Sequence, residues 1–148
     1  MGLCEVRHHM LIENRELRGR LNEIEALAIS VASGRSALFP FLRVRGLELL
    51  EALETQITWE EKFLLPAIRD IYGPERAARA GAEQRAHREL MRFQLEEITD
   101  RTRPPLLLAH GLRDLATVVR NELEEEERLF FDPDLLRGDG VFADVETG

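Results

Sequence analysis

Helix-breaking residues divide this 148-residue chain into four long segments of good helix formers. Clusters of Gly, Pro, Ser and Asp mark the breaks, at residues 33–40, 73–74, 102–105 and 132–133. The segments between them are rich in Leu, Ala, Glu and Arg and show no period-two alternation, so strands are not favoured. The sequence therefore predicts helices over residues 3–32, 41–72, 75–101 and 106–131.

Apolar residues recur three and four positions apart along these segments, which gives each helix one apolar face. The clearest example is the first segment, with Leu3, Val6, Met10, Leu17, Leu21, Ile24, Ala28 and Val31. Short connections favour antiparallel neighbours, so we expect an all-α fold, an antiparallel up-down-up-down four-helix bundle over residues 1–133. Pro66 is expected to kink the second helix or loosen its last turn.

A short tail, residues 134–148, follows the predicted bundle and is rich in Gly and Asp. Its apolar residues are candidates to dock on the bundle or on a partner: Leu135, Leu136, Val141 and Phe142.

Composition excludes several classes of function. The formal net charge is -8 and the pI is about 5.1, whereas nucleic acids and anionic membranes are bound by basic surfaces. The single cysteine, Cys4, allows no internal disulfide, and no apolar run approaches the roughly 20 residues that span a bilayer. We therefore expect a cytoplasmic protein without nucleic-acid or membrane partners. Lys62 is the only lysine among 20 basic residues, and such Arg-rich usage is typical of GC-rich bacterial genomes.

Each predicted helix carries two polar residues, four positions apart, on or beside its apolar face. The pairs are His9 and Glu13, Gln56 and Glu60, Glu83 and His87, and Glu122 and Glu126. Antiparallel packing of the four helices would bring all eight side chains to one end of the bundle. Buried carboxylates repel one another and lose hydration. Divalent cations would compensate, because inward Glu and His residues of helical bundles hold pairs of iron or manganese ions.

An internal repeat supports this register. Residues 56–65 align without gaps with residues 122–131, which pairs Gln56 with Glu122 and Glu60 with Glu126. The chain is therefore interpreted as a helical hairpin repeated twice.

The stretch Gln56-x-x-x-Glu60-Glu61-x-x-Leu64-Leu65-Pro66 resembles the H-x-x-x-E-E-x-x-L-F-P pattern of hemerythrin-like HHE cation-binding domains. The family has an isolated His in helices one and three and H-x-x-x-E in helices two and four. The resemblance covers about residues 5–133 and implies a four-helix bundle around a non-haem di-iron centre, with oxygen binding, iron handling or sensing as functions. It implies His9, Glu60, His87 and Glu126 as metal ligands.

Two positions depart from the family pattern. Gln56 and Glu122 stand where the family has histidines, so the predicted centre is rich in carboxylates and is not expected to bind dioxygen reversibly. Glu13, Glu83 and Glu122 are candidates to complete the coordination, and Gln56 is expected to hydrogen-bond beside it. We expect iron, with manganese or zinc as alternatives. Any reaction would be ferrous oxidation or the activation of dioxygen or peroxide. A second copy of the chain is a further candidate partner, which would give a homodimer.

Two other interpretations stay open. The chain is compatible with a metal-free relative that serves as a protein-interaction or regulatory module. It is also compatible with an ordinary structural bundle whose inward carboxylates pair with arginines such as Arg20. Glu124, Glu125 and Glu127 are expected on a solvated face, and His9, at the edge of its stripe, also fits a plain boundary residue.

Overall fold

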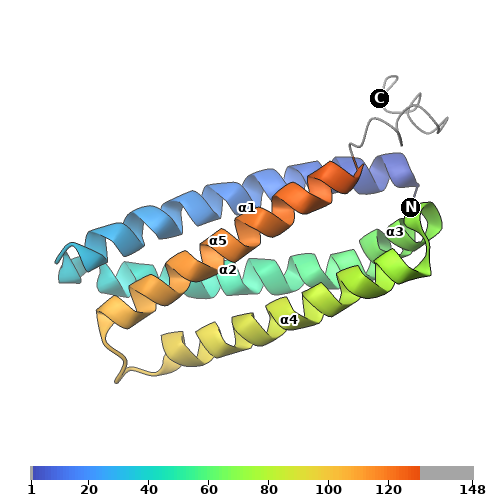
Figure 1. The fold of residues 1–148 in the computed structure, drawn as a ribbon. Helices are drawn as coiled ribbons and strands as arrows, with labels where there is room; N and C mark the ends of the chain where they lie inside the picture. The colour runs from blue at the N-terminus through green and yellow to red at the C-terminus, as the bar shows by residue number, and fades with distance from the viewer. Residues whose placement is uncertain (1, 131–148) are drawn as a thin grey trace.

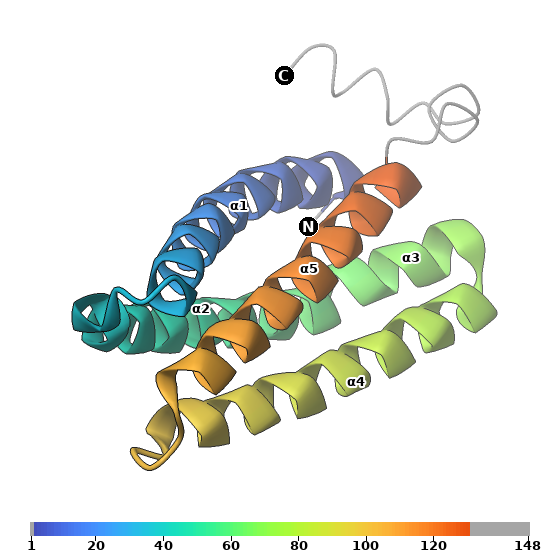
Figure 2. The ribbon, with the colours of Figure 1, turned by 60° about the vertical axis from the view of Figure 1, so that its left-hand side comes forward.

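A computed structural model describes residues 2–130 of the chain as a bundle of helices lying alongside one another (Figure 1). The elements in order are α1 (Leu3–Ala32), the 3₁₀ turn η1 (Ser36–Leu38), α2 (Phe39–Trp59), the π-helical turn η2 (Glu60–Leu64), α3 (Leu65–Tyr72), α4 (Pro74–Thr99) and α5 (Pro105–Phe130). Helix α5 lies between α1 and α4 (Figure 2), and α1 packs mainly against α5 and α2.

The all-helical class predicted from the sequence is confirmed. The described part of the chain contains no strand, and the predicted helix boundaries agree within two residues with those observed. Residue 131 and the tail, with the apolar residues proposed to dock, lie outside the described residues. No helix in the described part is both long and apolar enough to cross a membrane.

The second predicted helix is interrupted by the π-helical turn at Glu60–Leu64. Pro66 explains this interruption, because proline lacks an N–H and its ring clashes with the carbonyl four residues earlier, here that of Lys62. Widening one turn removes the clash without ending the helix, so α2 runs on through η2 into α3. Turns of this type are frequent at functional sites, and this one begins at Glu60.

The apolar core consists of two separate clusters stacked along the bundle. The larger cluster includes Leu17, Ile57, Met91 and Leu123 from four different helices. The buried members of the smaller cluster are Val6, Met10, Leu64, Ile68 and Phe130. Along α1, along α2 with η2, and along α5, polar residues occupy positions between the two clusters, so a polar layer crosses the bundle.

Gly46 is a buried position where the absence of a side chain allows close packing. A Cβ atom placed there would lie 3.0 Å from Cδ1 of Ile98 and 3.2 Å from Cδ1 of Leu112. We expect Gly46→Leu to lower the free energy of unfolding by about 1–3 kcal/mol through overpacking. Urea denaturation followed by circular dichroism measures this.

The matched control is Gly19→Leu, at an exposed position of α1 where a Cβ atom would meet nothing within 4 Å. We expect this control to stabilise the protein slightly, since leucine is the better helix former by roughly 1 kcal/mol. Equal free energies for the two variants would contradict the close packing at Gly46.

Candidate metal centre

The polar layer between the two apolar clusters receives side chains from all four long segments. Buried members are Asn14 from α1, Gln56 from α2, Glu60 from η2, Gln84 from α4 and Glu126 from α5, and the half-buried His87 and Glu122 complete the layer. On α5, residues 122 and 126 are one helical turn apart and therefore share a face. On α4, residues 84 and 87 share a face for the same reason.

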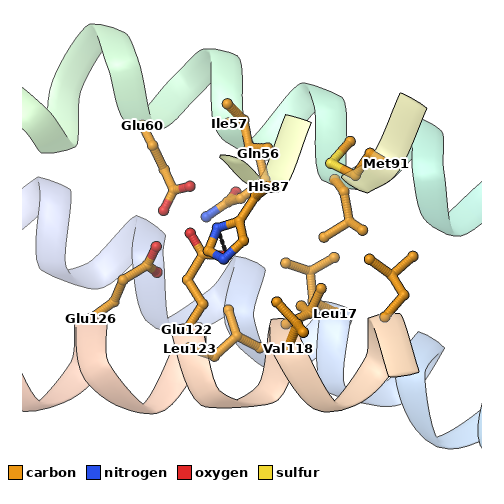
Figure 3. Close-up of a pocket in the computed structure, with 13 residues that line it drawn as sticks. Leu17, Gln56, Ile57, Glu60, His87, Met91, Val118, Glu122, Leu123 and Glu126 are labelled. Carbon is orange, nitrogen blue, oxygen red and sulfur yellow. Dashed lines mark ion pairs between the residues drawn. The ribbon is translucent and has the colours of Figure 1, made fainter. Parts of the chain in front are cut away.

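Three carboxylates in this layer converge. Glu60, Glu122 and Glu126 each offer an oxygen atom, and these three atoms lie within 4.8 Å of one another. Figure 3 shows the carboxylates of Glu60 and Glu126 pointing toward each other, with His87 and Glu122 beside them. A cavity of about 20 Å³ adjoins them, which is room for a single water molecule or ion.

Two of these carboxylates have a partner outside the group of three. Nδ1 of His87 lies 2.9 Å from Oε2 of Glu122. Nε2 of Gln84 donates a hydrogen bond of 3.3 Å to Oε1 of Glu60. The carboxyl groups of Glu60 and Glu126 hydrogen-bond to each other. The Oε2 atoms of both are buried and have no partner from any other residue in the described part of the chain.

Burial dominates the electrostatics of the cluster. Glu60 is 2% exposed and Glu126 is 8% exposed. Burial raises the pKa of Glu60 to about 7, and the negative charge of Glu122 adds to this rise. Burial also raises the pKa of Glu126 well above its usual value, with the neighbouring Glu60 as a further cause. The Glu122 carboxylate raises the pKa of His87.

Within residues 2–130, arginine does not neutralise the cluster. No ion pair between an arginine and Glu60, Glu122 or Glu126 is found among residues 2–130, and Arg20 is exposed. The nearby Arg18 instead binds Glu127 through hydrogen bonds of 2.7 and 2.8 Å. The structure therefore does not support the interpretation as a plain structural bundle with arginine-paired carboxylates.

The donor set fits a divalent transition metal. Three carboxylates and one imidazole offer the oxygen and nitrogen ligands that iron, manganese and zinc accept in proteins. The two buried oxygens without a hydrogen-bond partner outside this pair are atoms that a cation would satisfy, since unpaired buried polar groups are costly.

The structure brings together five of the eight residues predicted for the site. These five line one cavity and are Gln56, Glu60, His87, Glu122 and Glu126. Gln56 is buried among them as a neutral amide.

The other three predicted residues do not join this group. The ring of His9 stacks on Trp59 with centroids 4.1 Å apart, and its Nε2 lies 3.8 Å from Oε1 of Glu13. Both of these side chains are 36% exposed. Glu83 is exposed on α4 although it lies one helical turn before His87, and the adjacent Gln84 is the buried residue of that turn.

Two buried amides of the layer were not predicted. Asn14 is fully buried, and its Nδ2 donates a hydrogen bond of 3.4 Å to Oε1 of Glu127. Both Glu13 and Asn14 continue the three- and four-residue spacing between Met10 and Leu17, so the spacing alone did not choose between them. Gln84 shares its face with His87, three residues later, which was the signal on α4.

Comparison with known protein families identifies the family of the chain. Residues 6–132 match the model of the hemerythrin HHE cation-binding domain. No curated protein and no solved structure matches the chain. The match spans most of the 148 residues and includes every side chain of the carboxylate cluster, so this chain belongs to the hemerythrin HHE cation-binding family.

Proposed function

We propose that this protein binds divalent metal ions, iron being the first candidate, through Glu60, His87, Glu122 and Glu126. The observation that carries the proposal is the convergence of three carboxylates, two of them buried and each with an oxygen that has no hydrogen-bond partner outside this pair. Without a cation, burial keeps such groups from ionising. A bound divalent ion compensates their charge and uses the atoms that are otherwise unsatisfied.

The bundle around this centre is proposed to have the antiparallel up-down-up-down order. Short connections join consecutive segments, and Figure 1 draws each segment running back along the previous one. In this order the second half of α2 with η2, the second half of α5 and the first half of α4 lie at the same level, which supports the joint use of Glu60, His87 and Glu126.

The residues of the cluster have distinct proposed roles. Glu60 and Glu126 face each other and would hold the ion from two sides. Glu122 would bind it while accepting a hydrogen bond from His87, or His87 would turn its ring nitrogen to the ion. Gln84 orients Glu60 through its hydrogen bond, and such supporting contacts tune the affinity of metal sites. Iron bound here would supply chemistry with dioxygen or peroxide, or undergo ferrous oxidation.

The number of iron ions bound per chain distinguishes a single-ion centre from the di-iron centre that the sequence predicts. The protein is purified without a histidine tag, loaded with Fe(II) under nitrogen, desalted and analysed for metal by mass spectrometry. We expect at least one tightly bound iron per chain, because three carboxylate oxygens reach one small volume and His87 lies beside Glu122. A second iron per chain would support the di-iron centre. Loading with Mn(II) and Zn(II) in parallel ranks the three candidate metals.

A metal-free interaction module is the alternative function. The neutral amides Asn14, Gln56 and Gln84 favour it, because they fill the polar layer with groups that need no cation. Gln56 also stands where the family pattern has a histidine. Retention of no metal, together with a melting temperature that ignores all three ions, would support this alternative and contradict the metal site.

A further inference from the structure

An ion that binds at the carboxylate cluster needs a path through the packed side chains of the bundle. Glu60 and Glu126 are almost fully buried, and the cavity beside them holds only a single ion or water. The path must therefore open between two helices.

Two further cavities lie in line between this cluster and the surface. An inner cavity of about 50 Å³ shares Glu122 and Glu126 with the cavity of the cluster. An outer cavity of about 420 Å³ opens at the surface between α3, α4 and α5. Inner and outer cavities share five lining residues, Ile68, Ala80, Glu83, Glu125 and Leu129. Their shared lining residues place the cavities next to one another along the seam between α4 and α5.

The titratable side chains of the inner cavity are all carboxylates: Glu83, Glu122, Glu125 and Glu126. Glu83 and Glu125 are exposed and lie where the two cavities join, whereas Glu126 is buried and has an oxygen with no hydrogen-bond partner outside its pair with Glu60. Arg76, Arg79 and Arg128 line only the outer cavity. A cation that enters passes these three guanidinium groups first. From the junction of the two cavities inward it meets only carboxylates, first exposed and then buried.

Two other surface cavities do not offer such a path. One shares only Met91 with the cavity of the cluster, and the other shares only Leu17. Both shared residues are apolar, and apolar side chains offer no ligand that would offset the hydration a divalent cation loses on its way inward.

From these cavities we propose an entry route for divalent cations along the seam between α4 and α5. In this route Glu83 and Glu125 form an outer site that captures the hydrated ion and passes it to Glu122 and Glu126. This inference rests on the proposed metal site. It assigns Glu83, which the sequence predicted as a possible ligand, a role in capturing the ion instead.

Stopped-flow loading with Co(II) tests the route. Trp59 is the only tryptophan and directly precedes Glu60, so quenching of its fluorescence reports arrival of the ion. We expect the Glu83→Gln, Glu125→Gln double variant to load about tenfold more slowly, since carboxylates at an entrance accelerate the capture of cations. Its metal content at equilibrium should equal that of the wild type.

The matched control is the Glu89→Gln, Glu124→Gln double variant. It removes the same charge from exposed positions of α4 and α5 that line none of the described cavities. The control should load at the wild-type rate. Equal rates for the two double variants would overturn the role of Glu83 and Glu125.

Blocking the passage gives an independent test. Ala80 lines both cavities, and Ala80→Phe should slow both loading and the release of Co(II) to a chelator. Ala78→Phe, at an exposed position of α4, is the control, and circular dichroism checks that both variants are folded. Unchanged rates in folded Ala80→Phe would overturn the route itself. Failure of the wild type to bind Co(II) at equilibrium would instead contradict the proposed metal site.

Discussion

Replacing Glu60 by glutamine is expected to abolish tight metal binding while making the metal-free protein more stable. Glutamine has nearly the same shape, and its side-chain oxygen can still accept the hydrogen bond from Gln84. It offers no charge to a cation, however, so we expect the affinity for Fe(II) or Co(II) to fall by about 100-fold or more, beyond the loss typical for residues that only support a metal ligand.

The gain in stability has a separate cause. Glu60 is buried beside two other carboxylates, and at pH 8 its ionised form is destabilised by lost hydration and by repulsion. Removing this charge should raise the free energy of unfolding of the metal-free protein by about 2 kcal/mol at pH 8.

Two measurements check this prediction, isothermal titration with metal and urea denaturation in the presence of a chelator. Glu124→Gln is the matched control, because Glu124 is an exposed carboxylate of α5. We expect the control to change neither quantity. Wild-type affinity in Glu60→Gln would remove Glu60 from the ligand set, and a less stable metal-free variant would show that its carboxylate is structural.

The stability of the metal-free protein is expected to decrease as pH rises from 5 to 8. The pKa of Glu60 is raised from 4.5 to about 7 in the folded protein, and those of Glu126 and His87 are raised as well. Between pH 5 and 8 the folded state therefore binds more protons than the unfolded state, and stability falls with increasing pH. The shift of Glu60 alone corresponds to a loss of about 3 kcal/mol.

The groups with lowered pKa values do not cancel this trend. Arg18 lowers the pKa of Glu127, and hydrogen bonds from Thr102 lower that of Asp100. The stability that these two carboxylates contribute is fully present above their unfolded pKa values and is lost only as the pH falls below them. Between pH 5 and 8 these two carboxylates therefore do not change the free energy of unfolding.

Urea denaturation at pH 5, 6, 7 and 8 with a chelator present measures the trend. The Glu60→Gln variant should show a flatter profile, since it lacks one of the groups that titrate. Saturating metal should reverse the dependence, because metal binding requires deprotonated carboxylates and therefore stabilises more at higher pH. Stability that is constant or increases with pH in the metal-free wild type would contradict the raised pKa values.

The helices and the apolar faces were predictable from the sequence because they depend on local properties. Gly73 and Pro74 end one helix and begin the next through their own backbone preferences, and α1 begins and ends where the breaks in the sequence predicted. The inward positions of Glu60 and Glu126 also followed from local spacing, since both interrupt regular apolar stripes. The pattern of Glu60, Glu61 and Pro66 further indicated the family, which the family model confirmed.

Which polar residues of α1 and α4 enter the cluster was decided only by the tertiary structure. Neighbouring residues on a helix differ by about 100° in direction, so a stripe alone does not distinguish Glu13 from Asn14 or Glu83 from Gln84. On α1, Asn14 lies inward between Met10 and Leu17, which belong to the two apolar clusters. The stacking of His9 on Trp59 holds that imidazole near the surface. Local spacing thus determined the polar layer and its level in the bundle, whereas the rotation of each helix against its neighbours determined which side chains meet there.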